Sequence, residues 1–125
     1  MNVVVSSGWL EFFSDSDNAD FFAPAIEDID QLVVPSISLY EVFKRIHQQS
    51  GEDQALQVVA QTQQGKVIDL TSALALRAAH LSVQAKLPLE DSIILATAHA
   101  HQAILWTQDA EFQGLEDVRY IEKIS

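Results

Sequence analysis

Short runs of β-branched residues alternate with longer amphipathic stretches along the chain, and this alternation constrains the fold more than any other feature. A repeated switch between strand and helix periods is typical of a parallel sheet covered by helices. We therefore predict an α/β fold of three layers, α/β/α, with a parallel sheet of about five short strands. The expected strands are Val3 to Val5, Gln31 to Val34, Lys66 to Leu70, Ala103 to Thr107 and Val118 to Ile121.

Local signals set the expected helix ends. Ser6 and Ser7 can cap a first helix, Thr71 can cap a long one, and Pro88 suits a first helical position. Gly65 is expected to close the helix before it as the C′ residue. The expected helices are Gly8 to Phe13, Asn18 to Glu27, Ser36 to Gln49, Glu52 to Gln63, Thr71 to Lys86 and Pro88 to His101, with a short helical turn after Asp109.

Length and composition predict one globular domain over residues 1–125. The chain is 48% apolar and contains no cysteine, so a core is expected without disulfides or thiolate zinc sites. The first residues lack the basic flank of a secretion signal, and the apolar segment from Ile93 to Trp106 is interrupted by polar residues. We expect a soluble cytoplasmic protein that is not embedded in a membrane.

The charge balance limits the kinds of partner. The net charge is −11, with only seven Lys and Arg residues. This balance argues against a broad surface for nucleic-acid phosphates, because such surfaces depend on basic side chains. A nuclease is not excluded, because part of the excess can be a carboxylate cluster that bound cations neutralise; the rest favours solubility or a basic protein partner.

Three acids are predicted to meet at one edge of the sheet. Glu41 lies in the first turns after the second strand, and Asp109 follows the fourth strand. Asp91 opens the helix that precedes the fourth strand and runs antiparallel to it. Because parallel strands end at a common edge, these acids and Val5, which ends the first strand, should face one crevice.

Each acid also has a purely structural interpretation. Ser38 and Glu41 match a capping box, in which the Glu41 side chain accepts from a backbone N–H. Asp109 can be a plain N-cap. Asp91 can be favoured by the helix dipole, which is worth ~0.3–1 kcal/mol. Taken singly, none of the three acids distinguishes a cap from a functional group.

Four segments in order resemble the PIN-domain proteins of the VapC type, the toxin half of bacterial toxin–antitoxin pairs. The resemblance covers essentially the whole chain. No segment is diagnostic alone, but the order and spacing of the four are fairly specific. The segments are Val3 to Glu11, Pro35 to Val42, Leu87 to Ala98 and Leu105 to Phe112.

The resemblance implies a Mg²⁺- or Mn²⁺-dependent endoribonuclease with four carboxylates. The second, third and fourth acids of the family fall on Glu41, Asp91 and Asp109, which would be catalytic residues and metal ligands. The first acid falls on Val5, so one ligand is missing. The resemblance also implies supporting roles for Ser6 and Thr107 and an outer acid at Glu111. A cognate antitoxin, an RNA substrate and a homodimer are the partners that it implies.

The chemistry needs carboxylates for a general reason. Hard divalent cations prefer oxygen ligands, and a bound cation can generate hydroxide near neutral pH and stabilise charge on a phosphate. Without metal, crowded carboxylates should repel one another and raise at least one pKa. Loss of an inner ligand should cost at least ~10–100-fold in metal binding or rate. Val5 should leave the fold intact, so we predict a chain that is inactive or attenuated.

Three other functions can be compared with the sequence. A non-catalytic module that binds an antitoxin through the same acids stays open, because the charge alone suits a basic partner. A receiver domain would need acids after the first strand and an Asp closing the third, where this chain has Val5 and Thr71. The four histidines show no zinc-hydrolase spacing. Lys44 and Arg45 either meet phosphate or form ion pairs along the helix.

Overall fold

All the strands that the computed structural model describes, over residues 1–124, run parallel. They are β1 (Asn2–Val4), β2 (Val33–Pro35), β3 (Lys66–Ile68), β4 (Ile104–Thr107) and β5 (Val118–Tyr120). One hydrogen-bonded part has the order β1-β4-β5 and the other pairs β2 with β3. A parallel bridge between Asn2 and Leu32 joins the two parts, so the predicted parallel arrangement of five strands is confirmed.

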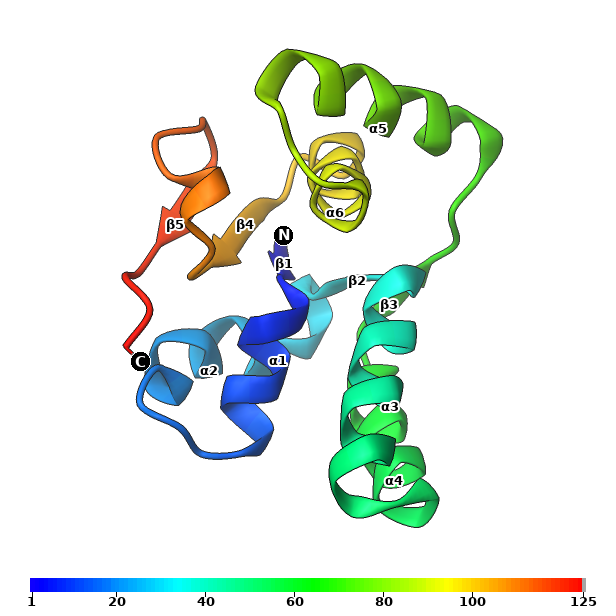
Figure 1. The fold of residues 1–125 in the computed structure, drawn as a ribbon, viewed down its shortest axis with the longest axis vertical. Coiled ribbons are helices and arrows are strands. Elements are labelled where there is room, and N and C mark those ends of the chain that lie inside the picture. Colours follow the sequence, from blue (N-terminus) through cyan, green and yellow to red (C-terminus); the bar gives the residue numbers. More distant parts are fainter. Residues whose placement is uncertain (125) are drawn as a thin grey trace.

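The helices lie on both sides of β1. Figure 1 shows β1 between α6 on one side and α1 and α2 on the other, while α3 and α4 form a long hairpin beside β2 and β3. None of the helices within residues 1–124 is long and apolar enough to cross a membrane. The helices are α1 (Ser6–Phe13), α2 (Ala19–Glu27), α3 (Ser36–Ser50), α4 (Glu52–Thr62), α5 (Ser72–Ala85) and α6 (Leu89–Ala100), with short 3₁₀ turns η1 (Ile29–Gln31) and η2 (Ala110–Phe112).

The start of α1 differs from the prediction. Ser6 and Ser7 are not caps but the first two residues of the helix, and Val5 occupies the N-cap position without a side-chain hydrogen bond. The Val5 carbonyl instead accepts backbone bonds from Gly8 and Trp9 at 2.9 and 3.2 Å. The first turn is therefore held by backbone bonds, which leaves both serine hydroxyls available for other partners.

Two other local signals had mixed outcomes. Thr71 caps α5 as predicted, because its hydroxyl accepts from the Leu74 N–H at 3.2 Å. Gly65 is not the predicted C′ residue, because the C-cap of α4 is Gln63, and its φ is not positive. A Cβ at Gly65 would lie 2.9 Å from side-chain and backbone atoms of Leu32. The close approach follows from β3 pairing, in which the Lys66 N–H donates to the Leu32 carbonyl at 2.8 Å. Gly65 is thus small for packing, not for its backbone angle.

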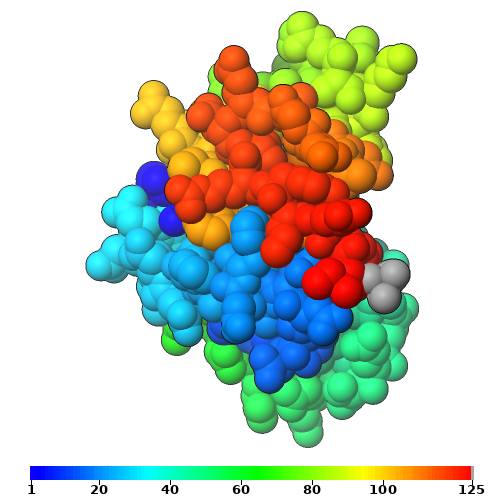
Figure 2. Space-filling view, turned by 90° about the vertical axis from the view of Figure 1, so that its left-hand side faces the viewer, coloured from blue at the N-terminus to red at the C-terminus, as the bar shows by residue number. Residues whose placement is uncertain are grey.

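The core lies between the sheet and the helices on both sides of it. Figure 2 shows the chain after β5 lying against the region of α2, and Asn18 secures it by donating to the Glu122 carbonyl at 3.2 Å. The core fixes β1 and α1, and so fixes the strand end from which the site is built. Its largest fully buried side chains include Trp9, Phe22, Leu32, Ile94, Leu105 and Phe112.

Candidate functional site

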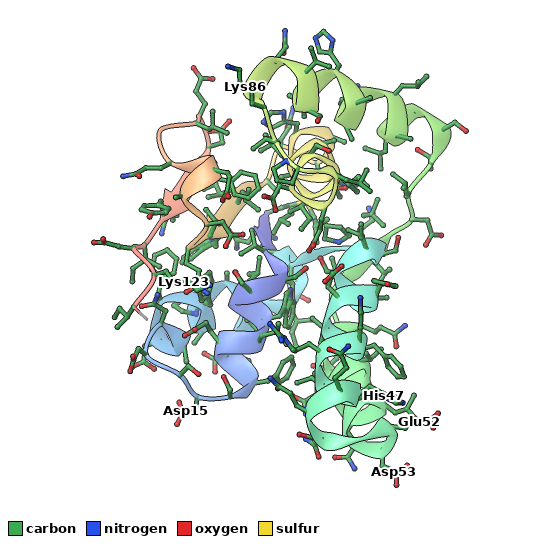
Figure 3. The ribbon with its side chains drawn as sticks, in the orientation of Figure 1. Asp15, His47, Glu52, Asp53, Lys86 and Lys123 are labelled. Atoms are coloured by element: carbon green, nitrogen blue, oxygen red, sulfur yellow. The ribbon has the colours of Figure 1, made fainter. Side chains whose placement is uncertain are left out.

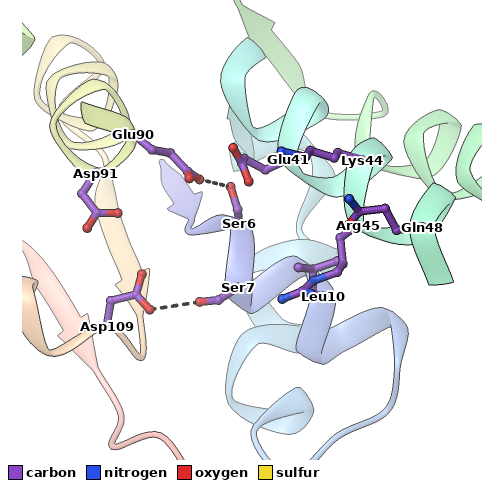
Figure 4. A pocket seen from close by; sticks show the side chains of 10 residues that line it. All are labelled: Ser6, Ser7, Leu10, Glu41, Lys44, Arg45, Gln48, Glu90, Asp91 and Asp109. Carbon is purple, nitrogen blue, oxygen red and sulfur yellow. Dashed lines mark hydrogen bonds between the residues drawn. The ribbon is translucent and has the colours of Figure 1, made fainter. Parts of the chain in front are cut away.

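A polar cavity of about 410 Å³ opens at the carboxyl end of the sheet, where α1, α3 and α6 come together with the loop after β4. Four carboxylates face it, three of them predicted from the sequence. The basic side chains of Lys44 and Arg45 lie on its α3 side (Figure 4). The lining residues are Ser6, Ser7, Leu10, Glu41, Lys44, Arg45, Gln48, Glu90, Asp91 and Asp109.

Parallel topology brings the acids together. Glu41 stands in α3, which begins directly after β2, and Asp109 follows β4 by two residues. Asp91 lies in the first turn of α6, which runs back along the sheet before β4. The expected convergence of Glu41, Asp91 and Asp109 is therefore seen in the structure, although they lie 50 and 18 residues apart in the sequence.

The side chains of Glu41 and Asp109 do not act as caps, although Asp109 does occupy the N-cap position of η2 as predicted. Helix α3 begins at Ser36 with Pro35 at the N-cap and no side-chain cap, and the Ser38 hydroxyl is buried without a hydrogen-bond partner among residues 1–124. Asp109 precedes η2 but makes no side-chain cap. Neither Glu41 nor Asp109 is used as a cap, so both carboxylates remain available to the cavity.

The two serines of α1 hold two of the carboxylates. The Ser6 hydroxyl donates to Glu90 Oε1 at 2.7 Å, and the Ser7 hydroxyl donates to Asp109 Oδ1 at 3.2 Å (Figure 4). Consecutive helical residues diverge by about 100° around the axis, so two neighbouring serines can reach two separate walls of the cavity. The first turn of α1 therefore positions acids from α6 and from the loop after β4.

Burial is the main cause of the raised pKa values of Asp91 and Asp109. It raises the pKa of Asp91 from 3.8 to about 7, with further contributions from the charges of Asp109, Glu111 and Glu90. Burial likewise raises the pKa of Asp109, against the lowering effect of the Ser7 hydrogen bond. A raised pKa was expected from crowding, but removal from water outweighs repulsion between the carboxylates.

Glu90 shows the same balance between burial and hydrogen bonding. Burial is the largest cause that raises its pKa, the hydrogen bond from Ser6 lowers it, and the charges of Glu41 and Asp109 raise it further. The charges of neighbouring acids raise the pKa of both Glu90 and Asp91, so the acidic side of the cavity disfavours ionised carboxylates. A bound cation would relieve this cost directly.

Val5 contributes no donor to the cavity. Its side chain is 1% exposed and belongs to the core, and its N–H donates to the Trp106 carbonyl at 3.1 Å. Its backbone continues the pairing of β1 with β4 by one residue. The end of β1 therefore keeps its place in the fold but offers an apolar side chain at this position.

The remaining predicted residues lie around the cavity rather than in it. Thr107 is buried at the end of β4, where its hydroxyl accepts from the Asp109 N–H at 2.9 Å and so fixes the backbone that carries this acid. Glu111 is exposed on η2, and its charge raises the pKa of Asp91 and Asp109. Thr107 and Glu111 therefore affect the backbone and the pKa of Asp109 without lining the cavity themselves.

Sequence reasoning missed Glu90 and the second serine. Glu90 stands directly before Asp91 in the first turn of α6, where an acid is common for reasons of helix polarity alone. Ser7 was expected only to cap. The available signal was topological: the first turn of α1 and the first turn of α6 start at the same edge of the sheet.

The donor set fits a hard divalent cation in its chemistry. Every titratable group in it is a carboxylate, apart from the two basic residues of α3, and serine hydroxyls stand among them. Within residues 1–124, no three His, Asp or Glu side chains are already gathered closely enough to hold an ion. Mg²⁺ does not require such a cage, because it keeps several waters and is commonly held by one or two carboxylates.

Comparison with known proteins gives the family and the fold. The PIN-domain sequence profile matches residues 3–118. A toxin–antitoxin complex from Klebsiella pneumoniae contains a chain that is 25% identical, with a TM-score of 0.79 over 95% of this chain and 96% of that one. No curated protein sequence matched the chain.

More distant structures share the fold. VapC20 from Mycobacterium tuberculosis, described as a toxin that cleaves the sarcin–ricin loop, is 14% identical, with a TM-score of 0.76 over 93% of this chain and 95% of its own. VapBC2 from Rickettsia felis, bound to promoter DNA, is 13% identical, with a TM-score of 0.73 over 97% of each chain.

Proposed function

The chain belongs to the PIN-domain family, and from this premise we propose that it is a cytoplasmic toxin of the VapC type. Its activity would be Mg²⁺- or Mn²⁺-dependent endoribonuclease cleavage, attenuated by Val5 and neutralised by a cognate antitoxin. The observation that carries the proposal is the meeting of Glu41, Asp91 and Asp109 around one cavity. This meeting occurs at the sheet edge where parallel α/β folds bind their ligands.

The side chains have distinct roles in the proposed reaction. A divalent cation would supply a nucleophilic hydroxide near neutral pH and stabilise charge on the scissile phosphate. Glu41, Asp91 and Asp109 would hold it through carboxylate oxygens, and Asp91 would release its proton to do so. Ser7 would keep Asp109 aimed at the cavity through its 3.2 Å hydrogen bond.

The basic side of the cavity suits a nucleic-acid backbone. Lys44 and Arg45 line it from α3, next to the turn that carries Glu41. The Lys44 ammonium also lies 5.6 Å from the centroid of the Tyr40 ring, and Tyr40 is 58% exposed. Phosphate oxygens of bound RNA could meet these cations while the scissile bond faces the acids. This arrangement concentrates positive charge locally in a chain that is strongly acidic overall.

The attenuation follows from the missing carboxylate. An Asp at position 5 would place a fourth negative group at the end of β1, whereas Val5 gives the cavity neither charge nor an acceptor for metal-bound water. Loss of a ligand weakens metal binding by at least ~10–100-fold, by comparison with changes in the surrounding shell. Activity is thus expected to be low because the cation is held weakly, not because the fold has changed.

The antitoxin is the proposed protein partner. An acidic, open cavity favours a basic side chain, and the net charge of −11 favours a basic partner in general. The similarity to a chain of a toxin–antitoxin complex supports the same partner. We expect the antitoxin to cover the cavity and place a cationic group among the acids.

The proposal also includes a homodimer. Several large apolar side chains stand exposed on α5 and at the start of α6, with Leu76, Val83 and Leu89 at 74%, 82% and 75% exposure. Exposed apolar surface of this kind is common where subunits meet. Sedimentation velocity of the purified chain would measure the mass directly, and a monomer at all concentrations would contradict this part.

Restoring the missing acid tests the function. The Val5→Asp variant should gain Mg²⁺- or Mn²⁺-dependent cleavage of an RNA substrate by about 10-fold or more over the wild-type chain. Cleavage should be abolished by a chelator. A matched Val5→Asn variant, of similar shape but without charge, should show no gain. If Val5→Asp and the wild type are equally inactive with both metals, position 5 is not the missing ligand position.

A non-catalytic function is the second candidate, and the apolar side chain of Val5 at the position of the first acid is the observation that favours it. In this case the acids would serve only to bind the antitoxin. Metal titration of the wild type and of Val5→Asp separates the two functions. Binding that appears or strengthens in Val5→Asp indicates a weakened enzyme, whereas binding in neither protein indicates a recognition module.

A further inference from the structure

The cavity holds a fourth carboxylate that does not come from the end of β1. Glu90 projects from the first turn of α6, and Figure 4 shows its side chain crossing toward α1. Asp91, the next residue, points to the other wall, where Asp109 lies. The two neighbouring acids of α6 therefore serve opposite sides of the same cavity.

The residue that holds the Glu90 side chain is the sequence neighbour of Val5. The Ser6 hydroxyl donates to Glu90 Oε1 at 2.7 Å, and Ser6 directly follows Val5 in the chain. The hydrogen bond thus ties the Glu90 carboxylate to the residue that directly follows Val5 in the chain. Among residues 1–124, the other carboxylate oxygen, Oε2, has no hydrogen-bond partner, and it can accept or coordinate.

Helix polarity does not by itself explain this geometry. An acid in the first turn stabilises a helix by interacting with its N-terminal N–H groups. In α6 the N-cap is Pro88, with no side-chain cap, and the Glu90 side chain is directed across the cavity to α1 instead. A half-buried carboxylate in an already acidic cavity is costly without a cation, so its position calls for a ligand or a structural contact.

We propose that Glu90 takes the place of the carboxylate that position 5 lacks and provides an oxygen ligand, direct or through water, for the divalent cation. This inference rests on the proposed function. The site then retains four acids, drawn from α3, from two positions of α6 and from the loop after β4. The attenuation by Val5 would then be partial, because Glu90 lines the cavity from the start of α6 as a fourth acid.

Titration with Mn²⁺ alone separates a ligand from a structural contact. In the Glu90→Gln variant the amide oxygen can still accept from Ser6, so a purely structural role predicts unchanged Mn²⁺ affinity. A ligand role predicts affinity weakened by about 10-fold or more. The matched control is Glu52→Gln, which removes the same charge at the outer end of the α3–α4 hairpin (Figure 3) and should leave Mn²⁺ binding unchanged.

Two further variants make the outcome decisive. Adding Val5→Asp to Glu90→Gln should restore affinity to at least the wild-type level, because position 5 then supplies the carboxylate. Asp91→Asn should abolish binding in either background. Circular dichroism of each variant would check that the fold is retained.

Three results would overturn the inference. If Glu90→Gln binds Mn²⁺ as the wild type does while Asp91→Asn loses binding, the role of Glu90 is wrong and the proposed metal centre stands. If Asp91→Asn also binds as the wild type does, the metal centre itself fails, and Glu90 with it. If Val5→Asp does not restore the Glu90→Gln protein, the two positions are not interchangeable.

Discussion

Neutralising Asp91 should stabilise the metal-free protein at neutral and alkaline pH. The pKa of Asp91 is raised from 3.8 to about 7, chiefly by burial. Between these values the folded chain holds a proton that the unfolded chain has released, so its stability falls as pH rises through this range. Asn at this position carries no charge to bury, and the Asp91→Asn variant should escape the loss.

The expected gain can be worked out from the pKa. One pH unit between folded and unfolded pKa values corresponds to about 1.4 kcal/mol, which gives ~4 kcal/mol for a fully desolvated group. Asp91 is only half-buried, and solvent screening reduces the figure by about half, to ~2 kcal/mol. The gain of Asp91→Asn should therefore be ~2 kcal/mol at about pH 8 and below ~1 kcal/mol at about pH 5.

Urea denaturation with a chelator present measures this difference. The free energy of unfolding of wild type and Asp91→Asn would be compared at the two pH values, with Asp17→Asn, an exposed loop acid, as the control for net charge. Asp17→Asn should change stability by less than ~0.5 kcal/mol. The reasoning is refuted if Asp91→Asn is no more stable than the wild type at the higher pH, or if its gain does not shrink as pH falls.

Three other substitutions test the support of the site. Thr107→Val removes the hydroxyl that accepts from the Asp109 N–H. The free energy of unfolding, measured by urea denaturation, should fall by ~1–3 kcal/mol, and the Mn²⁺ affinity, measured by calorimetry, should fall with it. Unchanged values would contradict the role of Thr107 in fixing Asp109. Ser7→Ala removes the donor that lowers the pKa of Asp109. The pH at which Mn²⁺ binding is half-maximal should therefore rise. An unchanged or lower pH midpoint would contradict this role of Ser7. Gly8→Ala would place a Cβ 2.7 Å from the Phe22 ring, so thermal unfolding should report ~1–3 kcal/mol of destabilisation, and an unchanged stability would contradict this close packing.

Much of the fold follows from local patterns that the structure confirms. The β-branched runs at Val3 and Val33 become strands because buried parallel strands favour such residues, and Thr71 caps α5 because a hydroxyl at that position satisfies a free N–H. Gly65 shows the limit of this reasoning. Its need for a small side chain comes from Leu32 across the sheet, a contact that no local pattern reveals.

The site was predictable where topology fixes it and not where side-chain direction decides it. The order of strands and helices is enough to bring Glu41, Asp91 and Asp109 to one edge. The pairing of Ser6 with Glu90 depends on which way two first-turn side chains point after packing, and a sequence pattern cannot set that direction. The capping signals at Ser6 and at Ser38 with Glu41 were misleading, because the same residue types also suit other roles.

The most direct test of the central claim is anomalous diffraction from crystals of the protein soaked in Mn²⁺. The account predicts an anomalous peak inside the cavity, within bonding distance of carboxylate oxygens of Asp91 and Asp109, with Glu41 and Glu90 as further direct or water-mediated neighbours. The peak should be stronger in crystals of the Val5→Asp variant. A fully soaked crystal with no peak in this cavity, in either protein, would contradict the assignment of a metal centre.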